Sequence, residues 1–359
     1  VERSVYEDAN FKEKLIDAAT SMKVGSVWEL GNIVGPMITN KNEKLLRGLT
    51  LEPGESWLVP PRFIDKKHYI LAPTIKWDVR PGSFSFREEM FGPLLSVSCF
   101  ETLEEAIALV NGLDYGLTSG IQTLDERERQ IWKDSIIAGN LYINRGITGA
   151  IVNRQPFGGM KLSAFGGGIK AGGPNYCTCF VQIKDKENAV LDYADSYSNA
   201  FEEEFRLPRD VNNLFGEQNV FRYLPLKNMV LRLFPNDPDE YVSMIAFAAS
   251  ICNTPLTISY DISDHRDALV ASTGCESKKE SLQQFLQGVA KYERIRTCSP
   301  NLPLEMYKTI NKLDKYIATA PPVKEGRVEL IHYIKEQSIA FEYHRYGSIA
   351  EVSEEELTL

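Results

Sequence analysis

Residues 139–168 hold the densest set of positions at which main chain could meet a ligand. The run reads GNLYINRGITGAIVNRQPFGGMKLSAFGGG, and its strand-like residues 141–144 are followed directly by a glycine-rich loop. Because glycine carries no Cβ, backbone amides in such a loop can approach an anionic group closely. A set of structural turns is the simpler interpretation of glycine density alone.

A second candidate group combines acids with an aromatic ring. Glu88 and Glu89 stand shortly before Phe91 and a Gly-Pro turn at 92–93. An ionised carboxylate is a charge-assisted, two-oxygen acceptor that suits a diol, and an aromatic side chain can form a wall beside a flat ring. Without further information, a solvated corner explains the same residues.

The cysteines and histidines give no catalytic or metal site. The six cysteines lack framework spacing, which is typical of a reducing compartment. Cys177 and Cys179 would share one face of a strand, but no second pair lies at ligand spacing. We therefore expect buried, small apolar side chains at these two positions and predict no metal site.

Composition limits the class of protein. The chain has 359 residues, enough for two domains, with 43% hydrophobic and 25% charged residues, as in ordinary globular proteins. The net charge of −9 argues against nucleic acid and against an anionic membrane surface as partners. No apolar run reaches the roughly 20 residues of a membrane helix, and no signal peptide is evident.

Strands alternate with helices along the chain, which predicts an α/β fold. Phe201 and Phe205 extend an aromatic stripe that begins at Tyr193 and Tyr197, and this four-residue spacing predicts a packing face on a helix. Asp237-Pro238 is expected to cap a helix. The predicted helices are 7–22, 102–111, 125–138, 184–207, 238–252, 279–290 and 304–318. The predicted strands are 69–75, 94–100, 121–123, 141–144, 229–234, 256–260 and 327–331.

The motif wording resembles the aldehyde dehydrogenase superfamily. Residues 144–161 and the run KAGGPNY at 170–176 are most similar to the glutamate-semialdehyde (1-pyrroline-5-carboxylate) dehydrogenase module of the bifunctional proline utilization A family. The resemblance implies the C-terminal part of a catalytic domain at 1–184, an open twisted sheet with helices. It further implies a helical linker at 185–213 and a smaller, non-catalytic α/β domain at 214–359.

The resemblance also implies roles for particular residues. Glu89 would accept hydrogen bonds from the nicotinamide ribose of NAD, and Phe91 would lie beside the nicotinamide. Thr148, Gly149 and Ala150 would hold the substrate's carboxylate. The remaining prediction is that Phe157 packs against the aliphatic part of the aldehyde; a core aromatic beside two glycines is an equally good interpretation of that residue.

In this family a cysteine thiolate attacks the aldehyde, hydride leaves to NAD, and water releases the acid. The resemblance places that cysteine just before the segment matching Val1, and none of the six cysteines stands in its motif. We therefore expect a C-terminal fragment with no catalytic residue and no turnover of its own. FAD is expected only in the absent proline dehydrogenase domain.

The implied partners are a small-molecule aldehyde, the remainder of the parent chain and further copies in a homo-oligomer. The implied location is the bacterial cytoplasm, and nothing here indicates membrane association of the parent. Two alternatives remain: a non-catalytic module for assembly and tunnel closure, or a dehydrogenase for another aldehyde. The second half is predicted to bind no NAD, because the turn 234–238 has two prolines and no glycine.

Overall fold

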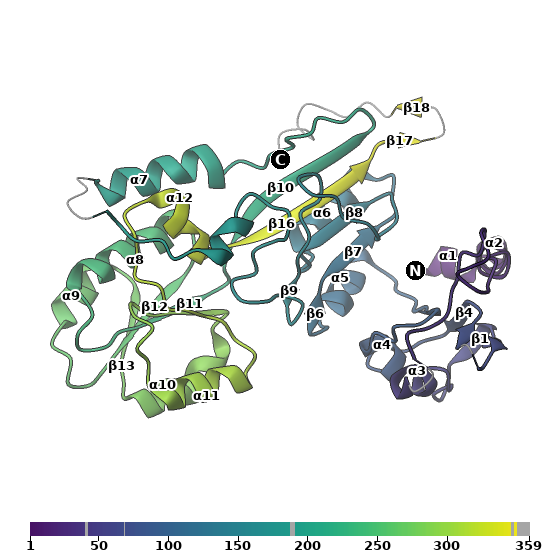
Figure 1. Cartoon of the computed structure of the whole chain (residues 1–359), viewed down its shortest axis with the longest axis horizontal. Helices are drawn as coiled ribbons and strands as arrows, with labels where there is room; N and C mark the ends of the chain where they lie inside the picture. The colour runs from purple at the N-terminus through teal and green to yellow at the C-terminus, as the bar shows by residue number, and fades with distance from the viewer. Residues whose placement is uncertain (40–41, 68, 187–190, 346–347, 350–359) are drawn as a thin grey trace. The chain divides into compact units, whose positions relative to one another are not determined.

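The computed structural model describes residues 1–39, 42–67, 69–186, 191–345 and 348–349 (Figure 1). The chain divides into two compact units, Val1–Leu113 and Asp114–Leu359. Each unit mixes helices with strands, so the predicted α/β class is confirmed.

The first unit is built around a three-stranded sheet in the order β1-β4-β5. Strand β1 (Ser56–Val59) runs antiparallel to β4 (Thr74–Trp77), and β5 (Leu94–Ser96) runs parallel to it. A separate hairpin pairs β2 (Phe63–Asp65) with β3 (Ile70–Leu71). The helices are α1 (Arg3–Glu7), α2 (Ala9–Thr20), α3 (Glu43–Gly48), α4 (Phe84–Arg87) and α5 (Leu103–Asn111).

Three predicted elements of the first unit are shorter or divided. The helix expected at 7–22 is α2, which begins only at Ala9 because Asp8 leaves the helical conformation and its side chain caps α2 at the amide of Asn10; α1 precedes it. The strand expected at 69–75 is interrupted before Thr74, where Pro73 has no amide hydrogen to donate. The strand expected at 94–100 ends at Ser96.

The second unit contains a four-stranded sheet in the order β10-β16-β8-β7. Strands β7 (Thr118–Ile121), β8 (Asn140–Ile143) and β16 (Ile334–Glu342) are parallel, and β10 (Glu217–Pro225) is antiparallel to β16. This sheet therefore joins strands from both sides of the predicted linker at 185–213. The three-part domain division remains a prediction, and its residues 187–190, 346–347 and 350–359 lie outside the described ones.

A five-stranded, all-parallel sheet fills the rest of the second unit, in the order β13-β12-β11-β14-β15. Its strands are β11 (Met229–Arg232), β12 (Leu256–Tyr260), β13 (Glu276–Lys279), β14 (Arg294–Arg296) and β15 (Ile317–Ala318). Met229 and Leu231 face one core cluster, whereas Val230 faces another, as the two-residue period of a strand requires.

Helices cover both faces of this parallel sheet (Figure 1). On one face lie α8 (Asp239–Ile251) and α9 (Asp267–Ser272), and on the other α10 (Leu282–Gly288) and α11 (Leu304–Lys312). The remaining helices are α6 (Glu126–Ser135), α7 (Tyr193–Ala200), α12 (Gly326–Glu329), a π-helical turn Phe201–Phe205 and 3-10 turns Tyr176–Phe180, Val289–Lys291 and Leu330–Tyr333. The short strands are β6 (Tyr115–Gly116), β9 (Met160–Lys161), β17 (His344–Arg345) and β18 (Ser348–Ile349).

The aromatic stripe is a packing face, as predicted. Tyr197 and Phe205 are buried in the core under α7, and Tyr193 and Phe201 pack against the same cluster. The ring of Tyr197 stacks on Phe247 of α8 at a centroid distance of 6.3 Å. The predicted helix 184–207 begins only at Tyr193 and changes to π-helical geometry at Phe201.

Several predictions for the second unit were wrong. Residues 327–331 form α12 and a 3-10 turn, and the strand β16 comes after them. The helix expected at 304–318 ends at Lys312, after which Asp314 takes a positive φ of 51° and Ile317 enters β15. The helix expected at 279–290 starts at Leu282, and the strand expected at 121–123 is β7, which ends at Ile121.

Two smaller expectations also failed. Cys177 and Cys179 lie on a 3-10 turn and are exposed, rather than buried on a strand. Asp237 does not cap α8: its carboxylate accepts from the amide of Phe234 at 2.7 Å and so closes the preceding turn, leaving Pro238 at the helix start. The run EYHRYG at 342–347 is only partly described, since Tyr346 and Gly347 lie outside the described residues.

Candidate functional site

The predicted acid and aromatic residues lie in the first unit, on the turn between α4 and β5. Glu89 is exposed, Met90 is buried and Phe91 is 68% exposed with a positive φ of 50°. The side-chain amide of Asn42 donates to the carbonyl of Met90 at 2.8 Å and thereby fixes the turn. Because only Met90 is anchored in the core, the side chains on either side of it are presented to solvent.

Glu89 differs from its neighbour in having no partner among the described residues. The carboxylate of Glu88 pairs with the ammonium of Lys44 at 2.8 Å. Within the described part of the chain, Glu89 has no hydrogen bond or ion pair. A free carboxylate beside an exposed ring is a chemically suitable pair for a diol and a flat heterocycle.

The predicted carboxylate-binding loop begins where β8 ends. Asn144 closes the strand with a positive φ of 57°. Thr148, Gly149 and Ala150 are all exposed, and Gly149 takes a φ of +89°. Nothing lies within 4 Å of the Cβ that an alanine would place at position 149, so the glycine is required by backbone conformation and not by crowding.

A hydrogen bond from the strand supports this exposed loop. The hydroxyl of Tyr142, on β8, donates to the carbonyl of Gly149 at 3.1 Å. Burial raises the pKa of the Tyr142 hydroxyl, with the charge of Arg145 acting in the opposite direction, so it remains a protonated donor at neutral pH. The tip of the loop is thus exposed, while the hydrogen bond from Tyr142 holds its main chain to β8.

The base of the loop is fixed to β10 through Glu217. The guanidinium of Arg145 donates to this carboxylate at 2.8 Å, and the amide of Gln155 donates to it at 3.0 Å. Gln155 donates also to the side chain of Asn219 at 2.9 Å. A half-buried carboxylate with two such donors is well satisfied, and it ties both ends of the loop to one strand.

Phe157 is half-buried and belongs to a second segment that returns to the start of β8. Its main chain forms a reciprocal pair of 3.0 Å hydrogen bonds with Ala171. The side chain of Asn140 donates to the carbonyl of Pro156 at 3.0 Å and accepts from the amide of Gly158 at 3.2 Å. A Cβ at Gly139 would lie 1.9 Å from the carbonyl oxygen of Gly158, so only glycine allows this close approach.

The structure brings some predicted residues together within each unit. Strand β8 holds both segments of the second unit: Tyr142 supports Gly149, and Asn140 supports the chain on either side of Phe157. Glu89 and Phe91 form their own group in the first unit. The sequence interpretation missed the supporting residues of these segments, although Lys170 and Asn175 stood inside the quoted run KAGGPNY.

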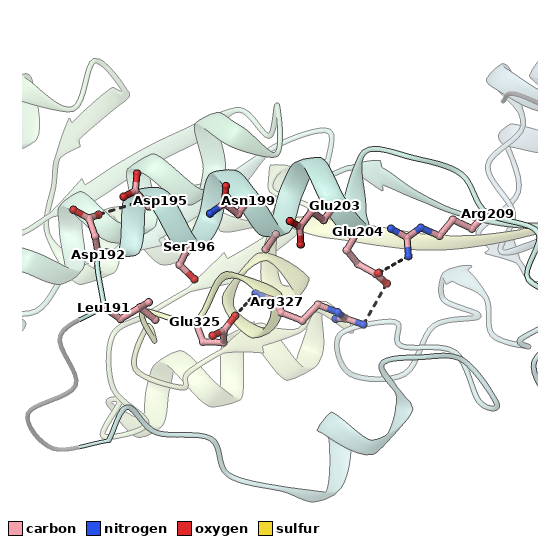
Figure 2. A pocket seen from close by; sticks show the side chains of 11 residues that line it. Leu191, Asp192, Asp195, Ser196, Asn199, Glu203, Glu204, Arg209, Glu325 and Arg327 are labelled. Carbon is pink, nitrogen blue, oxygen red and sulfur yellow. Dashed lines mark hydrogen bonds and ion pairs between the residues drawn. The ribbon is translucent and has the colours of Figure 1, made fainter.

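A separate cavity of about 630 Å³ lies beside α7, the π-helical turn and α12 (Figure 2). Glu204 occupies one end, where it accepts from Arg209 at 3.0 Å and from Arg327 at 3.3 Å. None of the predicted site residues lines it. The other lining residues are Leu191, Asp192, Asp195, Ser196, Asn199, Ala200, Glu203 and Glu325.

The described residues contain neither a metal-binding cluster nor a membrane-spanning helix. No group of three or more histidine, cysteine, aspartate or glutamate side chains there is arranged to hold a metal ion. Among the same residues, no helix combines the length and apolar character needed to cross a bilayer.

The chain belongs to the aldehyde dehydrogenase family, whose model matches residues 1–186. It is similar to the 1-pyrroline-5-carboxylate dehydrogenase of Bacillus licheniformis, at 34% identity over 186 residues, covering 51% of this chain and 35% of that relative. The enzyme of the same name from Bacillus subtilis is 31% identical over 191 residues, covering 53% and 36%. The chain therefore spans about a third of the length of these relatives.

One solved structure resembles nearly the whole chain. Proline utilization A from Corynebacterium freiburgense matches with a TM-score of 0.78 and 35% identity, covering 95% of this chain and 35% of that one. This match extends beyond residue 186 into the second half. The resemblance to the aldehyde dehydrogenase superfamily and to proline utilization A, first drawn from the motifs, is confirmed.

Proposed function

We propose that this chain forms part of an NAD-dependent 1-pyrroline-5-carboxylate dehydrogenase, which oxidises L-glutamate γ-semialdehyde to L-glutamate. The observation that carries the proposal is the left-handed Gly149 at the exposed tip of a loop supported by Tyr142. The names of the relatives supply the reaction, and the loop supplies a reason for a substrate that bears a carboxylate.

In this proposal, exposed main chain at 148–150 binds the substrate's carboxylate. Thr148 adds a hydroxyl donor, and Gly149 and Ala150 leave their backbone amides unobstructed. Phe157 provides an apolar wall for the aliphatic carbons, and its rigid attachment to β8 orients that wall. The binding energy is used for orientation, which is how a positioned aldehyde reacts faster than a free one.

The cofactor assignment rests on Glu89 and Phe91. The unpaired carboxylate of Glu89 fits the ribose hydroxyls, and the exposed ring of Phe91 fits the face of a nicotinamide. When bound, NAD supplies the acceptor for the hydride that leaves the substrate. The contribution of this chain is to bind and orient the cofactor.

The chain is further proposed to have no turnover on its own, because none of its cysteines is suited to be the nucleophile. Burial raises the pKa of the Cys298 thiol to about 12 and raises that of Cys252 still further. Burial also raises the pKa of the exposed Cys179. Formation of NADH by the purified 359-residue chain would refute this part of the proposal.

The substrate assignment is tested with Gly149→Ala in the complete enzyme that contains this chain. We expect KM for the semialdehyde to rise at least tenfold, while KM for a neutral aldehyde of equal length changes less than twofold. Gly274→Ala is the matched control, since Gly274 also has a positive φ, of 70°, and open space at its Cβ. Equal effects on both aldehydes would favour a dehydrogenase for another, neutral aldehyde.

A second function, as an assembly module, is favoured by a separate observation. Val211 and Phe215 are 70% and 79% exposed, and with Leu207 they make a run of exposed apolar side chains before β10. We propose that this run contributes to contacts in a homo-oligomer of the parent, located in the bacterial cytoplasm. Sedimentation of Phe215→Ser against wild type tests it, and an unchanged species distribution would contradict it.

A further inference from the structure

Lys170 is a fully buried lysine, 0% exposed, that contacts the segment next to Phe157 in the proposed aldehyde site. Its Nζ donates to the side-chain oxygen of Asn140 at 2.9 Å and to the carbonyl of Gly158. The side chain of Asn140 binds the main chain on either side of Phe157, and the carbonyl of Gly158 belongs to that main chain. The side chain also packs against Gly158, where an added Cβ would lie 3.2 Å from Lys170 Cγ.

The number of acceptors matches an uncharged amine. A neutral amine has two N–H donors, and Lys170 has two acceptors among the described residues. An ammonium has three donors, and its third N–H would be buried without an acceptor. In the described part of the chain, no carboxylate oxygen lies within the 4.0 Å of Nζ that an ion pair requires.

The charged group that interacts electrostatically with this amine is Glu336, on β16. Its carboxylate is engaged by other donors: the backbone amide of Lys170 at 2.6 Å and the side-chain amide of Asn175 at 2.6 Å. Asn175 in turn accepts from Arg327 at 2.6 Å. From β8 and from the chain at 156–159, the groups that face Nζ are the uncharged amide of Asn140 and a carbonyl.

We propose that Lys170 is a positioning residue for the aldehyde site: its uncharged amine holds the main chain of Phe157 and Gly158, and protonation of that amine releases it. The role of Phe157 as a wall rests on the proposed function, whereas the hold on the main chain does not. Protonation would leave a buried charge and an unsatisfied N–H, both of which are relieved when the segment opens to water.

The pKa of Lys170 makes the opening of this segment depend on pH. Burial lowers the pKa of the Lys170 ammonium to about 7, with the charge of Glu336 opposing the shift. When the segment opens, the amine regains its ordinary pKa of about 10.4 and takes up a proton. Opening is therefore favoured as the pH falls from about 10.4 towards 7 and levels off below 7, which amounts to about tenfold between pH 8 and pH 6.

The test is hydrogen exchange of peptides spanning residues 156–161 in the 359-residue chain, at pH 8 and pH 6, corrected for intrinsic exchange rates. Wild type is expected to lose about tenfold in protection at pH 6. Lys170→Met is expected to lose protection at both pH values equally. Lys315→Met, which removes a 2.6 Å bond to the carbonyl of Tyr292 in the parallel-sheet region, is the matched control and should keep the wild-type pH response.

Equal protection of wild type at the two pH values overturns the proposal, and this arm needs no variant to fold. A pH response that persists in Lys170→Met overturns it as well. In the complete enzyme, the ratio of variant to wild-type KM for the semialdehyde should be larger at pH 8 than at pH 6, with kcat unchanged. If exchange behaves as expected and KM does not, the hold on Gly158 stands and the role of Phe157 in the aldehyde site fails.

Discussion

The buried ion pair between Arg296 and Glu329 gives the strongest stability prediction. The guanidinium lies 3.0 Å from the carboxylate, and both side chains are essentially inaccessible. Glu329 also accepts from the hydroxyl of Tyr333 at 2.7 Å and from the amide of Val323 at 3.1 Å. The pair thus connects β14 with α12 and with the segment that leads into β16.

Removing the carboxylate charge of Glu329 leaves the buried guanidinium of Arg296 without a counter-charge. Burial lowers the pKa of Arg296, but the charge of Glu329 outweighs it, with Tyr333 acting in the same direction, and the net shift is upward. Because the ordinary pKa of a guanidinium is above about 12, the arginine stays charged in Glu329→Gln even without that partner. Breaking such a pair by neutralising one partner costs about 3–5 kcal/mol, and we expect this loss in the free energy of unfolding of the second unit.

An exposed ion pair provides the matched control. Glu202 and Arg206 lie 2.9 Å apart at i and i+4, with more than half of each side chain exposed. Because water screens such a pair, Glu202→Gln should cost less than about 0.5 kcal/mol. Replacing both buried partners, as Arg296→Met with Glu329→Leu, should recover part of the loss of Glu329→Gln, since no charge then remains buried.

The assay is urea-dependent hydrogen exchange, followed on peptides from β14 and β16. It reports opening of the second unit without requiring that the two units unfold together. If Glu329→Gln costs less than about 1 kcal/mol, close to the cost of Glu202→Gln, the prediction is wrong. The guanidinium of Arg296 would then not need the charge of Glu329.

Three further predictions concern the proposed site. Gly139→Ala should destabilise the second unit by at least about 2 kcal/mol in the same exchange assay, because its Cβ would lie 1.9 Å from the carbonyl oxygen of Gly158; a loss below 0.5 kcal/mol would contradict that close approach. Tyr142→Phe should cost about 1 kcal/mol and speed exchange at residues 147–151, since it removes the 3.1 Å bond to Gly149; unchanged exchange there would exclude the support. Glu89→Ala and Phe91→Ala should change the stability of the first unit by less than about 0.5 kcal/mol, because both side chains are exposed, while each raises KM for NAD in the complete enzyme; a normal KM would remove the cofactor assignment.

The local sequence pattern was sufficient to predict several elements. Strand β12 occupies 256–260 as expected, because its apolar and β-branched residues form a short buried run. The stripe from Tyr193 to Phe205 packs on the core because its four-residue spacing follows the helix. The loop after β8 was also indicated by sequence, since a left-handed position such as that of Gly149 favours glycine.

The sequence pattern did not predict the long strands β10 and β16, because they contain polar residues. Gln337 and Ser338 of β16 and Gln218 and Asn219 of β10 are buried, although sequence pattern assigns such residues to the surface. The side chain of Gln337 is satisfied by remote partners: it donates to the carbonyl of Ala138 at 2.9 Å and accepts from Arg222 at 2.8 Å. No local rule reveals a partner that distant.

By itself, the sequence determined the α/β class, the family motifs and the positions where main chain is exposed by glycine, because these depend on neighbours within a few residues. Only the tertiary structure decided how those positions are supported. Lys170 meets Gly158 and Asn140, and its amide meets Glu336, which is 166 positions away. Such contacts follow from the register of strands in a sheet, which forms only when the whole core is buried.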